Sequence, residues 1–158
     1  MPDTSLLLLL DEVRGKTLRV LQVIDPPFVR WAPPGLHNTI LWHAGHPYVL
    51  TEWLTTQALG RPPQIPEGWF GMFSRESRPA EVPDDRWPPL QEVIRHLETQ
   101  RERLRQVIGT LTDEQLGSPS VADPRHTVRR SILKGLHDEA CHCGEIRLLL
   151  KIQRTGGC

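Results

Sequence analysis

Two short stretches of the sequence concentrate side chains that can bind a transition metal. The first is Trp42-His43-Ala44-Gly45-His46, and the second runs from His137 to Glu145 as His-Asp-Glu-Ala-Cys-His-Cys-Gly-Glu. Imidazole, carboxylate and thiolate are the groups that bind zinc and similar borderline metals. If the fold brings the two stretches together, they supply the ligands of one metal site.

The second stretch offers two alternative ligand pairs, because residues four apart lie on the same face of a helix. The pairs are Asp138 with His142 and His137 with Cys141. The apolar positions of this predicted helix are Val128, Ile132, Leu136, Cys143, Ile146 and Leu150. At about 100° per residue, Asp138 and His142 lie on the flank of this apolar stripe, whereas the other pair lies nearly opposite it. Asp138 and His142 are therefore the predicted ligand pair.

Glu139 falls near the middle of the same apolar stripe. An ionised carboxylate is costly there unless it is paired, hydrogen-bonded or close to a metal. One interpretation is a general base or supporting group beside the metal. The other is a carboxylate satisfied by an arginine or a backbone amide. Glu145, one turn beyond His142, is likewise either a supporting group or a solvated side chain.

The first stretch leaves the choice between its two histidines open. On the helical wheel His43 lies nearer the apolar centre and His46 lies on the flank beside Trp53, so the wheel favours His43. Pro47 removes the donor that would bond to the carbonyl of His43 and predicts a kink within the cluster. Such a kink changes the phase of the wheel at the position where the choice is made.

Four segments with helical spacing of apolar residues must position these stretches. They span about residues 5–24, 36–59, 88–108 and 126–152, and the two stretches lie in the second and the fourth. The connection from Gly60 to about Asp85 is rich in proline and long enough to cross the whole length of a bundle. The sequence therefore predicts an all-α four-helix bundle with up-down-down-up topology and a long Pro-rich crossover between helices two and three.

Size and composition limit the classes of function. A chain of 158 residues can bury a core of its own, and we expect residues 1–158 to form a single domain. The 19 basic and 19 acidic residues cancel, so no overall field attracts nucleic acid or an anionic membrane. No apolar run reaches the roughly 18 residues of a membrane-spanning helix. The odd set of Cys141, Cys143 and Cys158 favours a reducing compartment, the cytoplasm, and we interpret the first two as packed thiols.

The motifs on the second and fourth helices resemble those of the DinB family of four-helix-bundle metalloenzymes over nearly the whole chain. Family members carry one histidine on helix two and a His-x-x-x-His pair on helix four, followed by x-Gly-Gln or x-Gly-Glu. The run His142-Cys143-Gly144-Glu145 fits that ending, and the Trp-x-x-x-His pattern selects His46 as the helix-two ligand, with His43 as the alternative. Asp138 stands where the family has the first histidine of the pair. The resemblance thus implies a divalent-metal site of His46, Asp138 and His142, suited to zinc, nickel or iron.

Two functions follow from this resemblance. The first is a metal-dependent transferase or hydrolase acting on a small molecule, in which Glu139 moves protons and a low-molecular-weight thiol such as mycothiol or bacillithiol is the cosubstrate. The second is a non-catalytic bundle that binds a metal or an apolar ligand as a stress-related module. In both cases we expect a homodimer, because helical surfaces of this kind commonly pair symmetrically.

The aromatic residues and histidines outside the two stretches give weaker indications of function. Trp69 and Phe70, in the long crossover, are the residues we expect to line a substrate pocket. His37, His96 and His126 have no partner at ligand spacing, so we assign them no chemistry.

Overall fold

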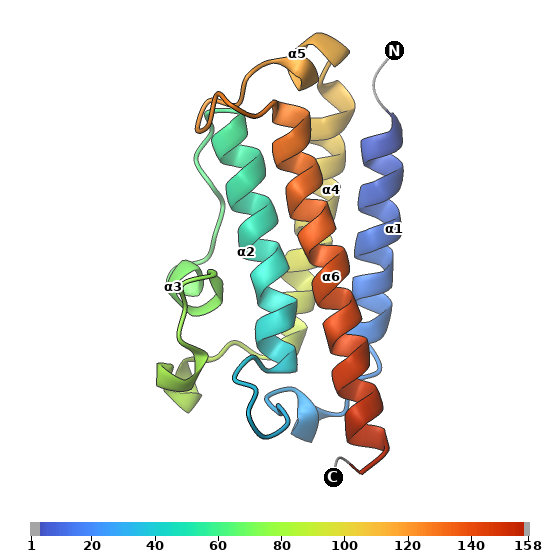
Figure 1. Cartoon of the computed structure of the whole chain (residues 1–158), viewed down its shortest axis with the longest axis vertical. Coiled ribbons are helices and arrows are strands. Elements are labelled where there is room, and N and C mark those ends of the chain that lie inside the picture. The colour runs from blue at the N-terminus through green and yellow to red at the C-terminus, as the bar shows by residue number, and fades with distance from the viewer. Residues whose placement is uncertain (1–3, 157–158) are drawn as a thin grey trace.

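The computed structural model describes residues 4–156, and all of its regular elements are helical (Figure 1). The long helices are α1 (Thr4–Leu21), α2 (Ile40–Ala58), α4 (Leu90–Thr110) and α6 (Val128–Arg154), and the short ones are α3 (Trp69–Phe73) and α5 (Asp113–Gly117). Single 3₁₀ turns span Pro26–Phe28, Pro79–Glu81 and Asp84–Arg86. The prediction of an all-helical chain is confirmed, since residues 4–156 contain no strand beyond one isolated bridge between Pro119 and Thr127. Cys158 lies outside the described residues.

The four long helices lie side by side (Figure 1). In this view α1 and α6 descend and α2 and α4 ascend, and the segment between α2 and α4 passes along the outer side of α2 with α3 beside it. Helix α2 packs against α6, and α1 packs against both α4 and α6. The two histidine-containing stretches therefore lie on neighbouring helices.

The helix ends are set by local capping. Helix α2 begins at Ile40, later than the predicted residue 36, because Thr39 is its N-cap and accepts a hydrogen bond of 3.2 Å from the Trp42 amide. Thr127 caps α6 in the same way through the Arg130 amide. Helix α2 continues without a break through Pro47, so the histidines stay on one helix.

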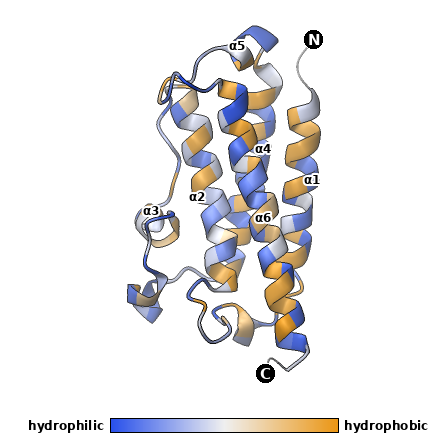
Figure 2. Cartoon of the chain, viewed as in Figure 1, coloured by the Kyte–Doolittle hydropathy of each residue, from blue (hydrophilic) through white to orange (hydrophobic). Residues whose placement is uncertain are grey.

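The core is divided into two apolar clusters. One contains Leu21, Ile40, Trp69, Phe73, Leu97 and Ile146 among others, and the second contains Leu6, Leu10, Leu104, Ile108, Leu116 and Leu136 among others. Hydrophobic and hydrophilic residues both occur along each long helix (Figure 2), as expected where one side of a helix faces a core. None of the described helices is both long and apolar enough to cross a bilayer.

A layer of buried polar side chains ties together all four long helices. Arg14 on α1 is fully buried and donates to Glu139 on α6 (2.7 and 2.9 Å) and to Gln100 on α4 (2.8 Å). Gln100 donates in turn to Glu52 on α2 (3.1 Å), whose carboxylate also accepts two hydrogen bonds from Arg103. Buried charges of this kind are tolerated because each is paired and hydrogen-bonded.

Candidate metal centre

Helices α2 and α6 approach each other closely where they carry the histidines and carboxylates. A Cβ atom added to Gly135 of α6 would lie only 3.0 Å from the Cα atom of Thr51 on α2. The small side chain at position 135 thus permits the short distance between the helices. That distance brings His46 of α2 within reach of Asp138 and His142, which lie one and two turns further along α6.

The three predicted ligands converge through one oxygen atom. Asp138 Oδ2 lies 3.4 Å from His46 Nε2 and 3.4 Å from His142 Nε2, and all three atoms lie within 4.8 Å of one another. Ligand atoms bound tetrahedrally to zinc at 2.0–2.1 Å are about 3.3 Å apart. Asp138 Oδ2 is buried and accepts no hydrogen bond of acceptable geometry from the described residues, although such atoms are nearly always satisfied. The residues present therefore fit a divalent ion.

The ring of His46 is oriented so that Nε2 faces this group. Its Nδ1 lies 2.6 Å from the carbonyl oxygen of Phe73, which can only accept, so Nδ1 carries the proton and Nε2 has the free lone pair. The indole of Trp42 stacks on the same ring at 4.6 Å between centroids. Histidines that bind a metal usually donate a hydrogen bond from their other ring N–H to a group such as a backbone carbonyl.

The surroundings favour the ionised form of Asp138 and the neutral form of His43. Burial raises the pKa of Asp138, but His142 and His46 outweigh this effect and hold the pKa well below its usual value. Burial, reinforced by His142 and His46, lowers the pKa of His43 to about 4, so its ring is neutral near pH 7. A carboxylate and neutral imidazoles are the forms that bind metals.

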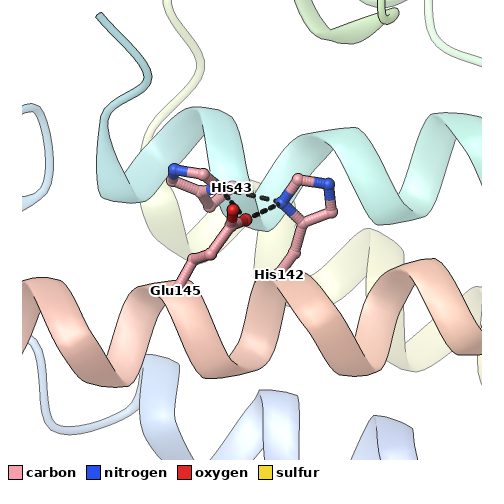
Figure 3. A group of neighbouring side chains, drawn as sticks. All are labelled: His43, His142 and Glu145. Carbon is pink, nitrogen blue, oxygen red and sulfur yellow. Dashed lines mark hydrogen bonds and ion pairs between the residues drawn. The ribbon is translucent and has the colours of Figure 1, made fainter. Parts of the chain in front are cut away.

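A second group of potential ligands lies on the other side of His142 (Figure 3). His142 Nδ1 is 2.8 Å from His43 Nδ1 and 2.6 Å from Glu145 Oε2, and His43 Nδ1 is 3.0 Å from the same oxygen. Both histidines of α2 thus lie beside His142: His43 contacts its Nδ1, and His46 contacts Asp138 Oδ2, which its Nε2 also contacts. His43 and His46, between which the helical wheel left the choice open, are therefore both buried, and each belongs to one of two neighbouring groups of potential ligands.

Glu139 belongs to neither group. It is fully buried, and both of its oxygens accept hydrogen bonds from Arg14. This is the arrangement expected from the alternative interpretation of Glu139, a carboxylate satisfied by an arginine. Arg14 was not singled out in the sequence, although it lies four residues after Leu10 and four before Leu18 and so falls in the apolar stripe of its own helix.

Each group adjoins a cavity. The cavity beside the first group measures about 180 Å³ and is lined by His46, Val49, Leu50, Trp53, Phe70, Ser74, Arg75 and Glu76. The cavity beside the second measures about 350 Å³ and is lined by Gly35, Leu36, His37, Asn38, His43, Glu145, Leu148 and Leu149. A larger cavity of about 550 Å³, between Pro26 and Trp87, contains none of the potential ligands.

The structure separates the lesser candidates. Phe70 lines the cavity beside His46, as predicted, and its ring lies 5.0 Å from that of Trp53. Trp69 instead packs in the core and lines neither of the two cavities beside the ligand groups. Cys143 is buried, but the prediction of a packed thiol is wrong for Cys141, which is exposed because it lies opposite the apolar stripe.

Comparison with known proteins agrees with this architecture. The DinB superfamily model matches residues 9–146. A crystal structure of a conserved protein from Enterococcus faecalis superposes with a TM-score of 0.67 at 15% sequence identity, and the match covers 96% of this chain and 99% of that one. At this identity the likeness concerns the fold alone. No protein of curated function matches the sequence.

Proposed function

The chain belongs to the DinB superfamily, and from this membership and the convergence of His46, Asp138 and His142 we propose that it is a divalent-metal-dependent enzyme acting on a small molecule. The observation that carries the proposal is the buried oxygen Asp138 Oδ2, which has two imidazole nitrogens at 3.4 Å and accepts no hydrogen bond of acceptable geometry within residues 4–156. A bound divalent ion supplies Lewis-acid polarisation and lowers the pKa of a coordinated nucleophile. Two histidines and one carboxylate suit zinc, nickel or iron and leave positions for substrate.

The chain's own residues supply the binding site for the substrate. The cavity beside His46 is about 180 Å³ in volume, with Trp53 and Phe70 as an aromatic wall and Arg75 and Glu76 as charged residues. This lining favours a small molecule with an apolar part. A low-molecular-weight thiol as the transferred or activating group remains part of the proposal, and it rests on the family resemblance. Transferase and hydrolase chemistry are distinguished by whether the thiol is incorporated into the product.

We propose a structural role for Glu139 in place of proton transfer. Its two oxygens are occupied by the Arg14 guanidinium, and its side chain is excluded from solvent and from both cavities. The proton-transfer role predicted from the sequence would require Arg14 to release the Glu139 carboxylate.

We further propose that the four long helices form one up-down-down-up bundle and one domain. Homodimer formation and a cytoplasmic location stay predictions.

Metal content is the direct test. The protein is purified without chelators, and bound metals are measured by plasma mass spectrometry for the wild type, Asp138→Asn and His142→Ala. Wild-type protein that carries stoichiometric metal, with a lower metal content in Asp138→Asn and in His142→Ala, supports the proposal. His126→Ala is the matched control, because His126 belongs to neither ligand group and should keep the metal. A metal content in Asp138→Asn equal to that of the wild type would contradict the assigned site.

Activity is tested with the metal-loaded protein. Thiol consumption is followed with a panel of small electrophiles, alongside hydrolysis of small amides and esters. Turnover by the wild type that is absent in Asp138→Asn supports an enzyme. Metal binding without turnover of any of these substrates favours the non-catalytic metal-binding module.

A further inference from the structure

We propose that His43, His142 and Glu145 form a second divalent-cation site, and that the His142 ring bridges it to the site of His46 and Asp138. The proposal depends on the proposed function through His142, which both sites share. It extends that function from a centre with one ion to a centre with two.

The geometry of the second group supports a cation site. Two ring nitrogens and one carboxylate oxygen meet with separations of 2.6, 2.8 and 3.0 Å (Figure 3). Each of these three atoms can carry a lone pair, so hydrogen bonds account for the contacts only if protons lie between them. The set of two histidines and one carboxylate is the same as in the first group, so both groups suit the same ions.

The second group can also open and be reached. The three separations are shorter than the roughly 3.3 Å between ligands of a tetrahedral zinc ion, so the group must widen by a few tenths of an ångström to accept one. The Glu145 side chain is 51% exposed, which leaves it free to move, whereas the His43 ring is only 9% exposed. The cavity of about 350 Å³ beside His43 and Glu145 provides an entry path and space for further ligands.

The position of His142 makes the two sites interdependent. Its Nε2 faces Asp138 and its Nδ1 faces His43 and Glu145, so the two groups lie at opposite nitrogens of one ring. A neutral imidazole carries a proton on one nitrogen and can ligate through the other. Binding of the second ion displaces this proton to the buffer and leaves the ring as a bridging imidazolate. With bonds of about 2 Å at each nitrogen, the two ions would be roughly 6 Å apart.

The alternative is that Glu145 and His43 only orient His142. Ligating histidines often donate a hydrogen bond from the second ring N–H to a carboxylate, and Glu145 is placed to accept one from His142. The two interpretations differ in the number of bound ions. If Glu145 only orients His142, each chain binds one ion, and if Glu145 is a ligand, each chain binds two.

The test is a zinc titration of metal-free protein, with bound metal counted by plasma mass spectrometry after removal of free zinc. We expect two equivalents in the wild type, one in Glu145→Gln and in His43→Ala, one in Asp138→Asn, and none in His142→Ala. Glu98→Gln, on an exposed position of α4, is the matched control and should keep two. Circular dichroism checks that each variant keeps its helices, and Glu145→Gln preserves the shape of a half-exposed side chain.

The outcomes separate this inference from the proposed function. One equivalent in the wild type, kept in Glu145→Gln and lost in Asp138→Asn, overturns the second site and leaves the first. One equivalent in the wild type that is kept in Asp138→Asn and lost in Glu145→Gln overturns both the bridged pair and the site of the proposed function. With copper(II) as the probe, a bridging ring couples the two spins, so the paramagnetic resonance signal at two equivalents falls short of twice the signal at one. A full double signal would overturn the bridge.

Discussion

The substitution Gly45→Ala should weaken both the fold and the metal centre. Gly45 lies against the ring of Phe73, and the carbonyl oxygen of Phe73 is the hydrogen-bond partner of His46. A Cβ atom at position 45 would lie 2.3, 2.4 and 2.6 Å from three ring carbons of Phe73. Carbon atoms in contact are about 3.5–4.0 Å apart, so the ring must move by more than about 1 Å. Overpacking of this kind costs about 1–3 kcal/mol of the free energy of unfolding.

The same displacement reaches His46 through the backbone of Phe73. The Phe73 carbonyl oxygen accepts the hydrogen bond from His46 Nδ1 at 2.6 Å, and a shift of about 1 Å would lengthen it beyond hydrogen-bond distance. Loss of such a partner lowers metal affinity about 10- to 100-fold. At 1.4 kcal/mol per tenfold, this corresponds to about 1.4–2.8 kcal/mol of binding free energy.

Two measurements on purified protein test this chain of reasoning. Urea unfolding followed by circular dichroism gives the free energy of unfolding, and competition with a zinc-binding dye gives metal affinity. Gly109→Ala on α4 is the matched control, because the nearest described atom to a Cβ there is Leu7 Cδ1, at an ordinary contact distance of 3.9 Å. It should leave metal affinity unchanged and stabilise the helix by about 0.5–1 kcal/mol. Wild-type stability in Gly45→Ala would refute the packing argument, and reduced stability with wild-type affinity would refute the role of the Phe73 carbonyl.

Three further predictions concern the elements that hold the centre. Arg14→Met should lower the free energy of unfolding by about 3–5 kcal/mol, since it leaves Glu139 charged and buried without its partner; the double variant with Glu139→Met should recover part of this in urea unfolding, and no recovery would contradict the pairing. Gly135→Ala should cost about 1–3 kcal/mol and weaken metal binding, because its Cβ would meet the backbone of Thr51, which cannot rotate away; wild-type affinity would show that the centre does not depend on the spacing of α2 and α6. Zinc at 100 times its dissociation constant should raise the free energy of unfolding of the wild type by about 2.7 kcal/mol for each ion bound, and that of His142→Ala by much less; equal thermal shifts would place the metal elsewhere.

Prediction from the sequence was most successful where the controlling interactions are local. The spacing of Asp138 and His142 determines that they share a face of α6, because residues four apart on any helix are neighbours. The capping threonines 39 and 127 likewise act on amides three residues away, and they explain why α2 and α6 begin later than apolar spacing alone predicts. The five-residue helix α3 was missed because it lies in a proline-rich segment without periodicity.

The sequence by itself determined that the chain is helical and that Glu139 occupies a buried stripe, since both follow from periodicity along a single helix. It did not determine the partner of Glu139, because Arg14 lies 125 residues away and only packing of α1 on α6 brings the two together. Likewise, the wheel favoured His43 and the family pattern favoured His46, because each describes α2 without the helix it packs against. In the tertiary structure His142 lies beside both: its Nδ1 contacts His43, and its Nε2 contacts Asp138 Oδ2, which also contacts His46. The rotation of one helix relative to another depends on contacts such as Gly135 against Thr51 and Gly45 against Phe73, which join residues distant in the sequence.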